Sequence, residues 1–156
     1  MFEVLFLLAF TLHNIEEAMW LPAWSAHAGK FHPAVAKNEF HFAVLVVTVI
    51  GFFLTFAYMV TGNTNEVVKY LYFGFILMMC MNAVFPHVLA TIFLRRYMPG
   101  TITGCILNLP IGLYMIFVDK KQNIADVKLL IGFMAVTVLI VSVLKPLFRL
   151  GKKLLD

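Results

Sequence analysis

The sequence predicts an all-α protein, a polytopic transmembrane helical bundle of about five spans that forms one domain over residues 1–156. Two observations predict this. Apolar residues make up 62% of the 156-residue chain and charged residues only 13%, whereas a soluble domain is about 45–50% apolar and about 25% charged. The apolar residues also gather into five long segments with short polar stretches between them. This composition excludes a soluble globule, a disordered tail and a nucleic-acid-binding module.

The first three apolar segments, residues 2–20, 42–60 and 70–94, are each long enough to cross a bilayer. A spanning helix needs about 20 residues, with a range of about 17–25. Trp20 closes the first segment, at the level where aromatic side chains meet lipid headgroups. The second segment has no charged residue, and the third contains Asn82, Pro86 and His87.

The last two segments are shorter. Residues 101–118 contain Asn108 and Pro110, and they are few enough to form a re-entrant helix instead of a span. Residues 129–147 are bordered by Lys128 and include Lys145, whose long side chain can reach the membrane surface. A break at Pro99-Gly100 separates the third segment from the fourth.

The distribution of lysine and arginine predicts the orientation. With five spans, one side carries four basic residues: Lys69, Lys120, Lys121 and Lys128. The other side carries eight, namely Lys30, Lys37, Arg95, Arg96, Lys145, Arg149, Lys152 and Lys153. Because basic loops stay in the cytoplasm, we expect the N-terminus outside and the C-terminus inside a bacterial inner or plasma membrane.

Three ionisable residues interrupt the first apolar segment: His13, Glu16 and Glu17. An acidic residue within the membrane costs roughly 2.5–3.5 kcal/mol, while a Leu, Phe or Val returns only about 0.3–0.6 kcal/mol. On a helix, Glu16 lies about 60° to one side of His13 and Glu17 about 40° to the other. All three side chains therefore project from one face, and intramembrane ionisable residues usually mark a functional site.

Two short motifs give the sequence a family resemblance. Residues His13 to Glu17 fit the pattern His-x-x-Glu-Glu, and residues Tyr97 to Gly100 fit Tyr-x-Pro-Gly. In these motifs and their order the chain resembles the HXXEE-domain family. The family also has a further histidine, for which His87 is the first candidate and His41 the second. The resemblance implies a small polytopic membrane protein of unassigned activity, and it implies no mechanism.

The expected depth of the polar residues predicts that they meet. Three of them, His13, His87 and Asn108, lie seven residues from segment ends on the same side of the membrane. Each is then roughly 10 Å below the same interface. Small residues beside Asn108, such as Gly104 and Gly112, allow close helix packing. We therefore expect one polar cavity that contains His13, the glutamates and His87, with Asn108 in its wall.

These side chains suit a divalent metal, zinc or iron. Imidazole and carboxylate groups are ligands for both ions. We take His13, Glu17 and His87 as the first ligands, and Glu16 as a further ligand or an acid–base group. The catalytic candidates are His13, Glu16, Glu17, Asn108 and Tyr97. Tyr97 either orients the start of the fourth helix or contacts a substrate headgroup.

The function that fits best is metal-dependent hydrolysis or oxidation of a lipid-like or small apolar substrate, near the cytoplasmic leaflet. One alternative is a metal-free isomerase or cyclase in which a buried glutamic acid donates a proton. Another is a small proton-coupled transporter or a subunit of a membrane complex. A purely structural polar cluster is the remaining alternative. The expected partners are membrane lipids and, given the small size, a second copy of the chain, but no nucleic acid.

Overall fold

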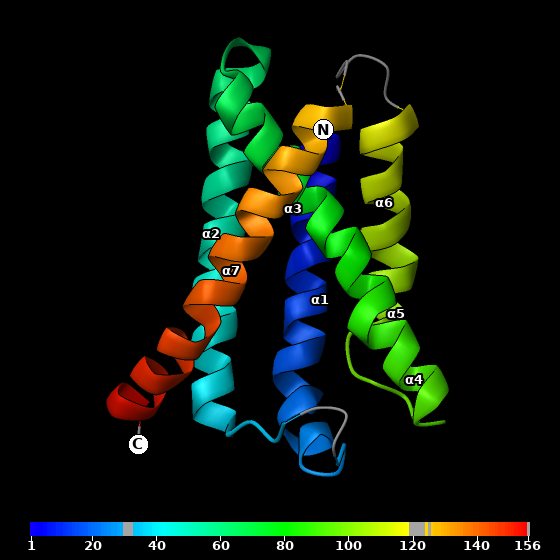
Figure 1. Ribbon diagram of the computed structural model, residues 1–156, viewed down its shortest axis with the longest axis vertical. Coiled ribbons are helices and arrows are strands. Elements are labelled where there is room, and N and C mark those ends of the chain that lie inside the picture. Colours follow the sequence, from blue (N-terminus) through cyan, green and yellow to red (C-terminus); the bar gives the residue numbers. More distant parts are fainter. Residues whose placement is uncertain (30–32, 119–123, 125, 156) are drawn as a thin grey trace.

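The computed structural model describes residues 1–29, 33–118, 124 and 126–155, and it is built from helices (Figure 1). In chain order the elements are α1 (Phe2–Ser25), α2 (Lys37–Thr61), η1 (Gly62–Thr64), α3 (Glu66–Asn82), η2 (Ala83–Val88), α4 (Leu89–Phe93), α5 (Thr101–Thr103), η3 (Gly104–Asn108), α6 (Leu109–Leu113), η4 (Tyr114–Val118) and α7 (Asp126–Leu155). The turn η1 is a 3₁₀ helix, while η2, η3 and η4 have π-helical hydrogen bonding. Three lysines used above for the orientation, Lys30, Lys120 and Lys121, lie outside the described residues.

Within the described residues, five helical segments are long and apolar enough to span a membrane, which confirms the predicted fold class. They are Phe2–Ser25, Lys37–Thr61, Glu66–Phe93, Thr101–Val118 and Asp126–Leu155. The fourth has 18 residues, which is enough for a span. Four of the five extend beyond the apolar segments at one or both ends. Three of them, α2, α3 and α7, continue into flanking polar residues, whereas α1 continues through residues 21–25, which are mostly apolar.

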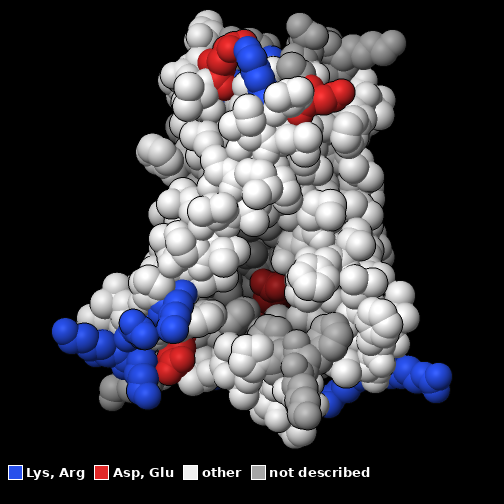
Figure 2. All heavy atoms as spheres, viewed as in Figure 1, with Lys and Arg blue, Asp and Glu red and all other residues white. Residues whose placement is uncertain are grey.

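The surface has the polarity of an integral membrane protein. Lys, Arg, Asp and Glu gather at the two ends of the molecule, and an apolar band lies between them (Figure 2). Large apolar side chains in this band point outward; Phe53, for example, is 72% exposed. The two chain termini lie toward opposite ends (Figure 1), as five spans require.

Two apolar clusters form the interior, one toward each end of α1. The larger one includes Phe6 and Phe10, whose rings meet the edge of Phe75 from α3 at centroid distances of 6.2 and 5.1 Å. The smaller one includes Leu21 and Trp24. The polar residues 13–17 lie on the stretch of α1 between these clusters, so they are enclosed at both ends by packed apolar side chains.

Polar contacts and close glycine packing hold the neighbouring helices to this framework. Asn14 of α1 donates to the hydroxyl oxygen of Thr48 in α2 at 2.8 Å. His41, also in α2, uses Nε2 to donate to the carbonyl of Ala18 at 2.7 Å. His41 therefore links two helices and is not part of the polar centre. In α7, Gly132 lies so close to α3 that a Cβ atom there would overlap its backbone.

Candidate functional site

The site begins on α1, which buries the residues that the sequence singled out. The side chains of His13 and Glu16 are buried, and Glu17 keeps 16% of its side chain exposed. Because His13 and Glu17 are four residues apart, they lie about one helical turn apart on the same face of α1. Figure 2 shows an acidic side chain at the bottom of a hollow in the apolar surface.

An interruption in the third span brings His87 to the same place. The helix leaves regular geometry at Phe85, where φ is −124° and ψ is 117°. Pro86 follows and has no N–H to continue the helical hydrogen bonds. At the break Phe85 faces outward, while His87, two residues later, is 1% exposed. The break thus lets a histidine enter the interior from a helix whose neighbouring residues face lipid.

Three ligand-type atoms converge between α1 and η2. Oε1 of Glu17 lies 3.0 Å from Nε2 of His87 and 3.7 Å from Nε2 of His13. The two imidazole rings meet edge to face with their centroids 5.0 Å apart. One such atom from each residue lies within 4.8 Å of the other two. We refer to His13, Glu17 and His87 as the ligand centre.

Asn82 at the end of α3 borders the ligand centre. Its Nδ2 lies 3.2 Å from Nε2 of His13 and 3.1 Å from Nε2 of His87. An amide NH₂ has two hydrogens, so it can donate to both imidazoles at once. Rotation of the amide by 180° would instead present its oxygen to the same point, since the two orientations have nearly the same shape.

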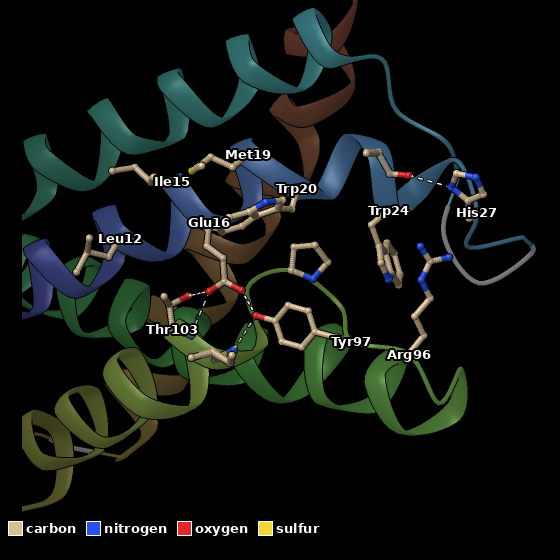
Figure 3. Close-up of a pocket in the computed structure, with 13 residues that line it drawn as sticks. Leu12, Ile15, Glu16, Met19, Trp20, Trp24, His27, Arg96, Tyr97 and Thr103 are labelled. Carbon is tan, nitrogen blue, oxygen red and sulfur yellow. Dashed lines mark hydrogen bonds between the residues drawn. The ribbon is translucent and has the colours of Figure 1, made fainter.

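Glu16 points about 100° around α1 from Glu17, and each of its oxygens accepts two hydrogen bonds. Figure 3 shows those from Tyr97 and Thr103. Oε1 accepts from the Tyr97 hydroxyl and from the Gly100 backbone N–H at 2.7 Å. Oε2 accepts from the Thr103 backbone N–H at 3.2 Å and from the Thr103 hydroxyl at 2.6 Å. Burial, together with the hydrogen bond to Glu16, raises the pKa of Tyr97 to about 12, so the phenol remains a donor.

Thr103 connects Glu16 to the ligand centre. Its hydroxyl hydrogen is directed to Glu16, and Nδ1 of His13 lies 3.1 Å from the same hydroxyl oxygen. The hydroxyl can only accept at that contact, so Nδ1 of His13 carries the hydrogen. In a neutral imidazole the other nitrogen, Nε2, then has a lone pair directed at Glu17 and Asn82. Histidines that bind metals are commonly oriented in this way by a partner of their second nitrogen.

Gly100 allows the two imidazoles to approach the segment after Tyr97. Its φ is +93°, a conformation that residues with a Cβ rarely adopt. A Cβ there would lie 2.6 Å from Cε1 of His87 and 2.9 Å from Cε1 of His13. Nδ1 of His87 is buried beside this glycine and has no hydrogen-bond partner among the described residues. Gly100 is therefore required both by the turn and by the space it leaves.

The structure brings together most of the residues expected at the site. His13, Glu17 and His87 form the ligand centre, while Glu16 lies outside it and contacts Tyr97, which holds the start of the fourth helical segment. Asn108 is fully buried, but no described residue hydrogen-bonds to its side chain.

Sequence reasoning missed the roles of Asn82, Gly100 and Thr103. Asn82 and Thr103 are polar residues inside apolar segments, which is a signal of the same kind as that given by His87. Gly100 was recognised as a break in the chain, but its contact with the two histidines had no signal in the sequence.

Comparison with known proteins identifies the family. A family model described as "Protein of unknown function with HXXEE motif" matches residues 4–115. The chain belongs to this family. A relative from Bacillus subtilis (strain 168), described as "Uncharacterized protein YrkK", is 38% identical over 153 residues, which cover 97% of this chain and 96% of the relative. No solved structure matches the chain.

The side chains of the HXXEE motif contact two different parts of the structure. The histidine and the last glutamate, His13 and Glu17, point to the ligand centre. The first glutamate, Glu16, points to the segment that carries Tyr97, Gly100 and Thr103. The two adjacent glutamates thus serve different partners, because neighbouring residues on a helix are separated by about 100°.

We expect Gly100→Ala to destabilise the protein more than Gly29→Ala. Gly29 also has a positive φ, +61°, but nothing lies within 4 Å of its absent Cβ. Both variants incur a conformational cost of about 1–2 kcal/mol, and only Gly100→Ala adds overlap with the histidines, worth roughly 1–3 kcal/mol. Thermal unfolding in detergent measures the difference, and equal melting temperatures for the two variants would contradict the close packing at Gly100.

Proposed function

We propose that this protein is a membrane-embedded, metal-dependent enzyme that acts on a lipid-like or small apolar substrate by hydrolysis or oxidation. The observation that carries the proposal is the convergence of Glu17 Oε1 with Nε2 of His13 and Nε2 of His87. Two histidines and one carboxylate are the ligand set of catalytic zinc sites and of non-haem iron sites. A bound ion of this kind supplies Lewis-acid polarisation or, for iron, oxidative chemistry.

Charge balance supports a cation at the ligand centre. When ionised, Glu17 places a negative charge in the interior of the bundle, and within the described residues its only ion-pair contacts are with His13 and His87. A buried carboxylate must be paired, coordinated or protonated. Nε2 of His13, which carries the lone pair, lies 3.7 Å from this carboxylate, so a cation between them would interact favourably with both atoms.

The residues around the ligand centre have distinct tasks in this proposal. His13 is held in one tautomer by Thr103 and Glu16. Without a metal, Asn82 donates to both Nε2 atoms; with a metal on those atoms, the rotated amide would present its oxygen as an additional ligand. Glu17 is the partly exposed member of the centre, so reactants reach the centre at its carboxylate.

The same contacts also favour a second candidate, metal-free acid–base catalysis. The 3.0 Å distance between Glu17 and His87 is short enough for a shared proton on Nε2 of His87. Nothing described holds Nδ1 of His87, so this imidazole can adopt either tautomer. An isomerase or cyclase would use this pair to deliver a proton.

Bound metal distinguishes the two candidates. We expect near-stoichiometric zinc or iron in wild-type protein purified in detergent, and a loss of at least tenfold in Glu17→Gln. The matched control is Glu66→Gln, which removes a carboxylate at an exposed ion pair with Lys128 and should keep the wild-type metal content. Elemental analysis gives the metal, and thermal unfolding shows that each variant is folded. Equal metal in all three proteins, including none, would reject Glu17 as a ligand.

Thr103 tests how His13 is positioned. We expect Thr103→Val, which keeps the shape but removes the hydroxyl, to lower metal affinity by about 10–100-fold. Thr103→Ser retains the hydroxyl and should bind metal as wild type does. Competition with a chelator of known affinity measures the change. Wild-type affinity in Thr103→Val would show that the hydrogen bond to Nδ1 of His13 has no influence on the ligand centre.

The proposed topology has the N-terminus outside and the C-terminus in the cytoplasm, with the ligand centre nearer the cytoplasmic leaflet. Basic side chains cluster at the lower end of the view in Figure 2, and the C-terminus lies at that end in Figure 1. We expect a green fluorescent protein fused to the C-terminus to fluoresce and an alkaline phosphatase fused there to be inactive. An active phosphatase fusion without fluorescence would reverse the topology.

A further inference from the structure

A groove of about 890 Å³ runs along the outer side of α1, between that helix and residues 96–103. Most of its lining is apolar: Leu12, Ile15, Met19, Trp20, Ala23, Trp24, Pro99 and Ile102. Four of these side chains face outward and are about half exposed: Leu12, Ile15, Met19 and Trp20. The groove therefore opens onto the surface that meets lipid. From Leu12 to Trp24 it follows roughly 18 Å of helix axis.

Polar groups in the groove are confined to two places (Figure 3). Glu16, Tyr97 and Thr103 form part of its wall, about 12 Å along α1 from Trp24. Arg96 and His27 line the other end, beside Trp24. The oxygens of Glu16 are already occupied by four hydrogen bonds, so its carboxylate is not available to pair with a cation in the groove.

Arg96 is the cationic group of the groove. It is exposed, and among the described residues it has no ion-pair partner. It lies three residues beyond Phe93, the last residue of the third candidate span, which is where we expect lipid headgroups. A guanidinium group at this level binds phosphate and carboxylate oxygens well, while the apolar walls extend from it toward the bilayer interior.

We propose that the groove binds a membrane lipid with a net negative headgroup, whose headgroup contacts Arg96 and whose acyl chain lies along Met19, Ile15 and Leu12. The charge at one end and the apolar length of the rest match the two parts of such a molecule. This inference goes beyond the proposed function, because the lipid lies beside the ligand centre and does not enter it. The binding itself needs no metal.

One layer of side chains lies between the groove and the ligand centre. Thr103 and Glu16 line the groove on one side, and Thr103 contacts Nδ1 of His13 on the other. The ligand centre itself is not part of the groove lining. A lipid in the groove is therefore separated from the ligand centre by this one layer of side chains.

The protein contains its own probe for this binding. It has two tryptophans, Trp20 and Trp24, and both line the groove. Brominated acyl chains quench tryptophan fluorescence on contact. One set of vesicles contains brominated phosphatidylglycerol and the other brominated phosphatidylcholine, each mixed with unlabelled phosphatidylcholine. We expect stronger quenching of the tryptophan fluorescence by the brominated phosphatidylglycerol. One cation at the membrane surface corresponds to a preference of about fivefold for the anionic lipid.

Arg95 provides the matched control. Arg95 is the adjacent residue and does not line the groove, so Arg95→Gln and Arg96→Gln remove the same charge at the same membrane surface. We expect the preference for phosphatidylglycerol to disappear in Arg96→Gln, to persist in Arg95→Gln and to return in Arg96→Lys. Equal quenching by the two lipids in wild type, or equal losses in Arg95→Gln and Arg96→Gln, would overturn the proposal.

A measurement on chelator-treated protein distinguishes the lipid proposal from the metal proposal. The lipid preference is expected to be unchanged after chelation, because Arg96 and the apolar walls contain none of the ligand centre. If wild type shows the preference but binds no metal, the proposed enzyme chemistry fails and the lipid site stands. If metal depends on Glu17 but the preference is absent, the lipid proposal fails alone.

Discussion

The buried carboxylate of Glu16 is the constraint on which the rest of the site depends. A carboxylate in the apolar interior is stable only when its oxygens are satisfied. Tyr97, Gly100 and Thr103 satisfy them, and all three come from the stretch between the third and fourth spans. One side chain of α1 therefore fixes where the fourth span begins. This explains why the Tyr-x-Pro-Gly element and the HXXEE motif occur together in one small chain.

The position of that segment then determines the geometry of the histidines. Gly100 lies against both imidazole rings, and only a residue without a side chain fits there. Thr103, three residues later, orients His13 through Nδ1. His87 receives no such hydrogen bond among the described residues; its place is set by the break at Phe85 and Pro86 and by Asn82. The two histidines are therefore not equivalent, since one tautomer is fixed and the other is not.

Helical geometry made much of this site predictable from the sequence. The spacing of His13, Glu16 and Glu17 fixes their common face, and the expected depths placed His87 beside them. From the sequence we take Glu17 as a first ligand and keep Glu16 as a further one, because helical geometry alone does not exclude Glu16: both glutamates lie within about 60° of His13. That choice depends on which neighbouring helix packs on each side. The hydrogen bonds of Asn82 and Thr103 depend on the interruption in the third span and on the segment after it, neither of which follows from local periodicity.

Because Glu16 and Glu17 contact different partners, they also determine where the groove lies relative to the ligand centre. Had both carboxylates pointed at the histidines, the wall of the groove would carry no hydrogen-bonded carboxylate, and the segment 97–103 would lack its anchor. Instead, Glu16 borders the groove and Glu17 borders the ligand centre, on two sides of the same helix. Thr103 contacts Glu16 and His13 at once. A displacement of residues 97–103 by an occupant of the groove would therefore alter the hydrogen bond that orients His13 and the packing of Gly100 against both imidazole rings. Segment 97–103 thus connects the apolar groove to the polar centre.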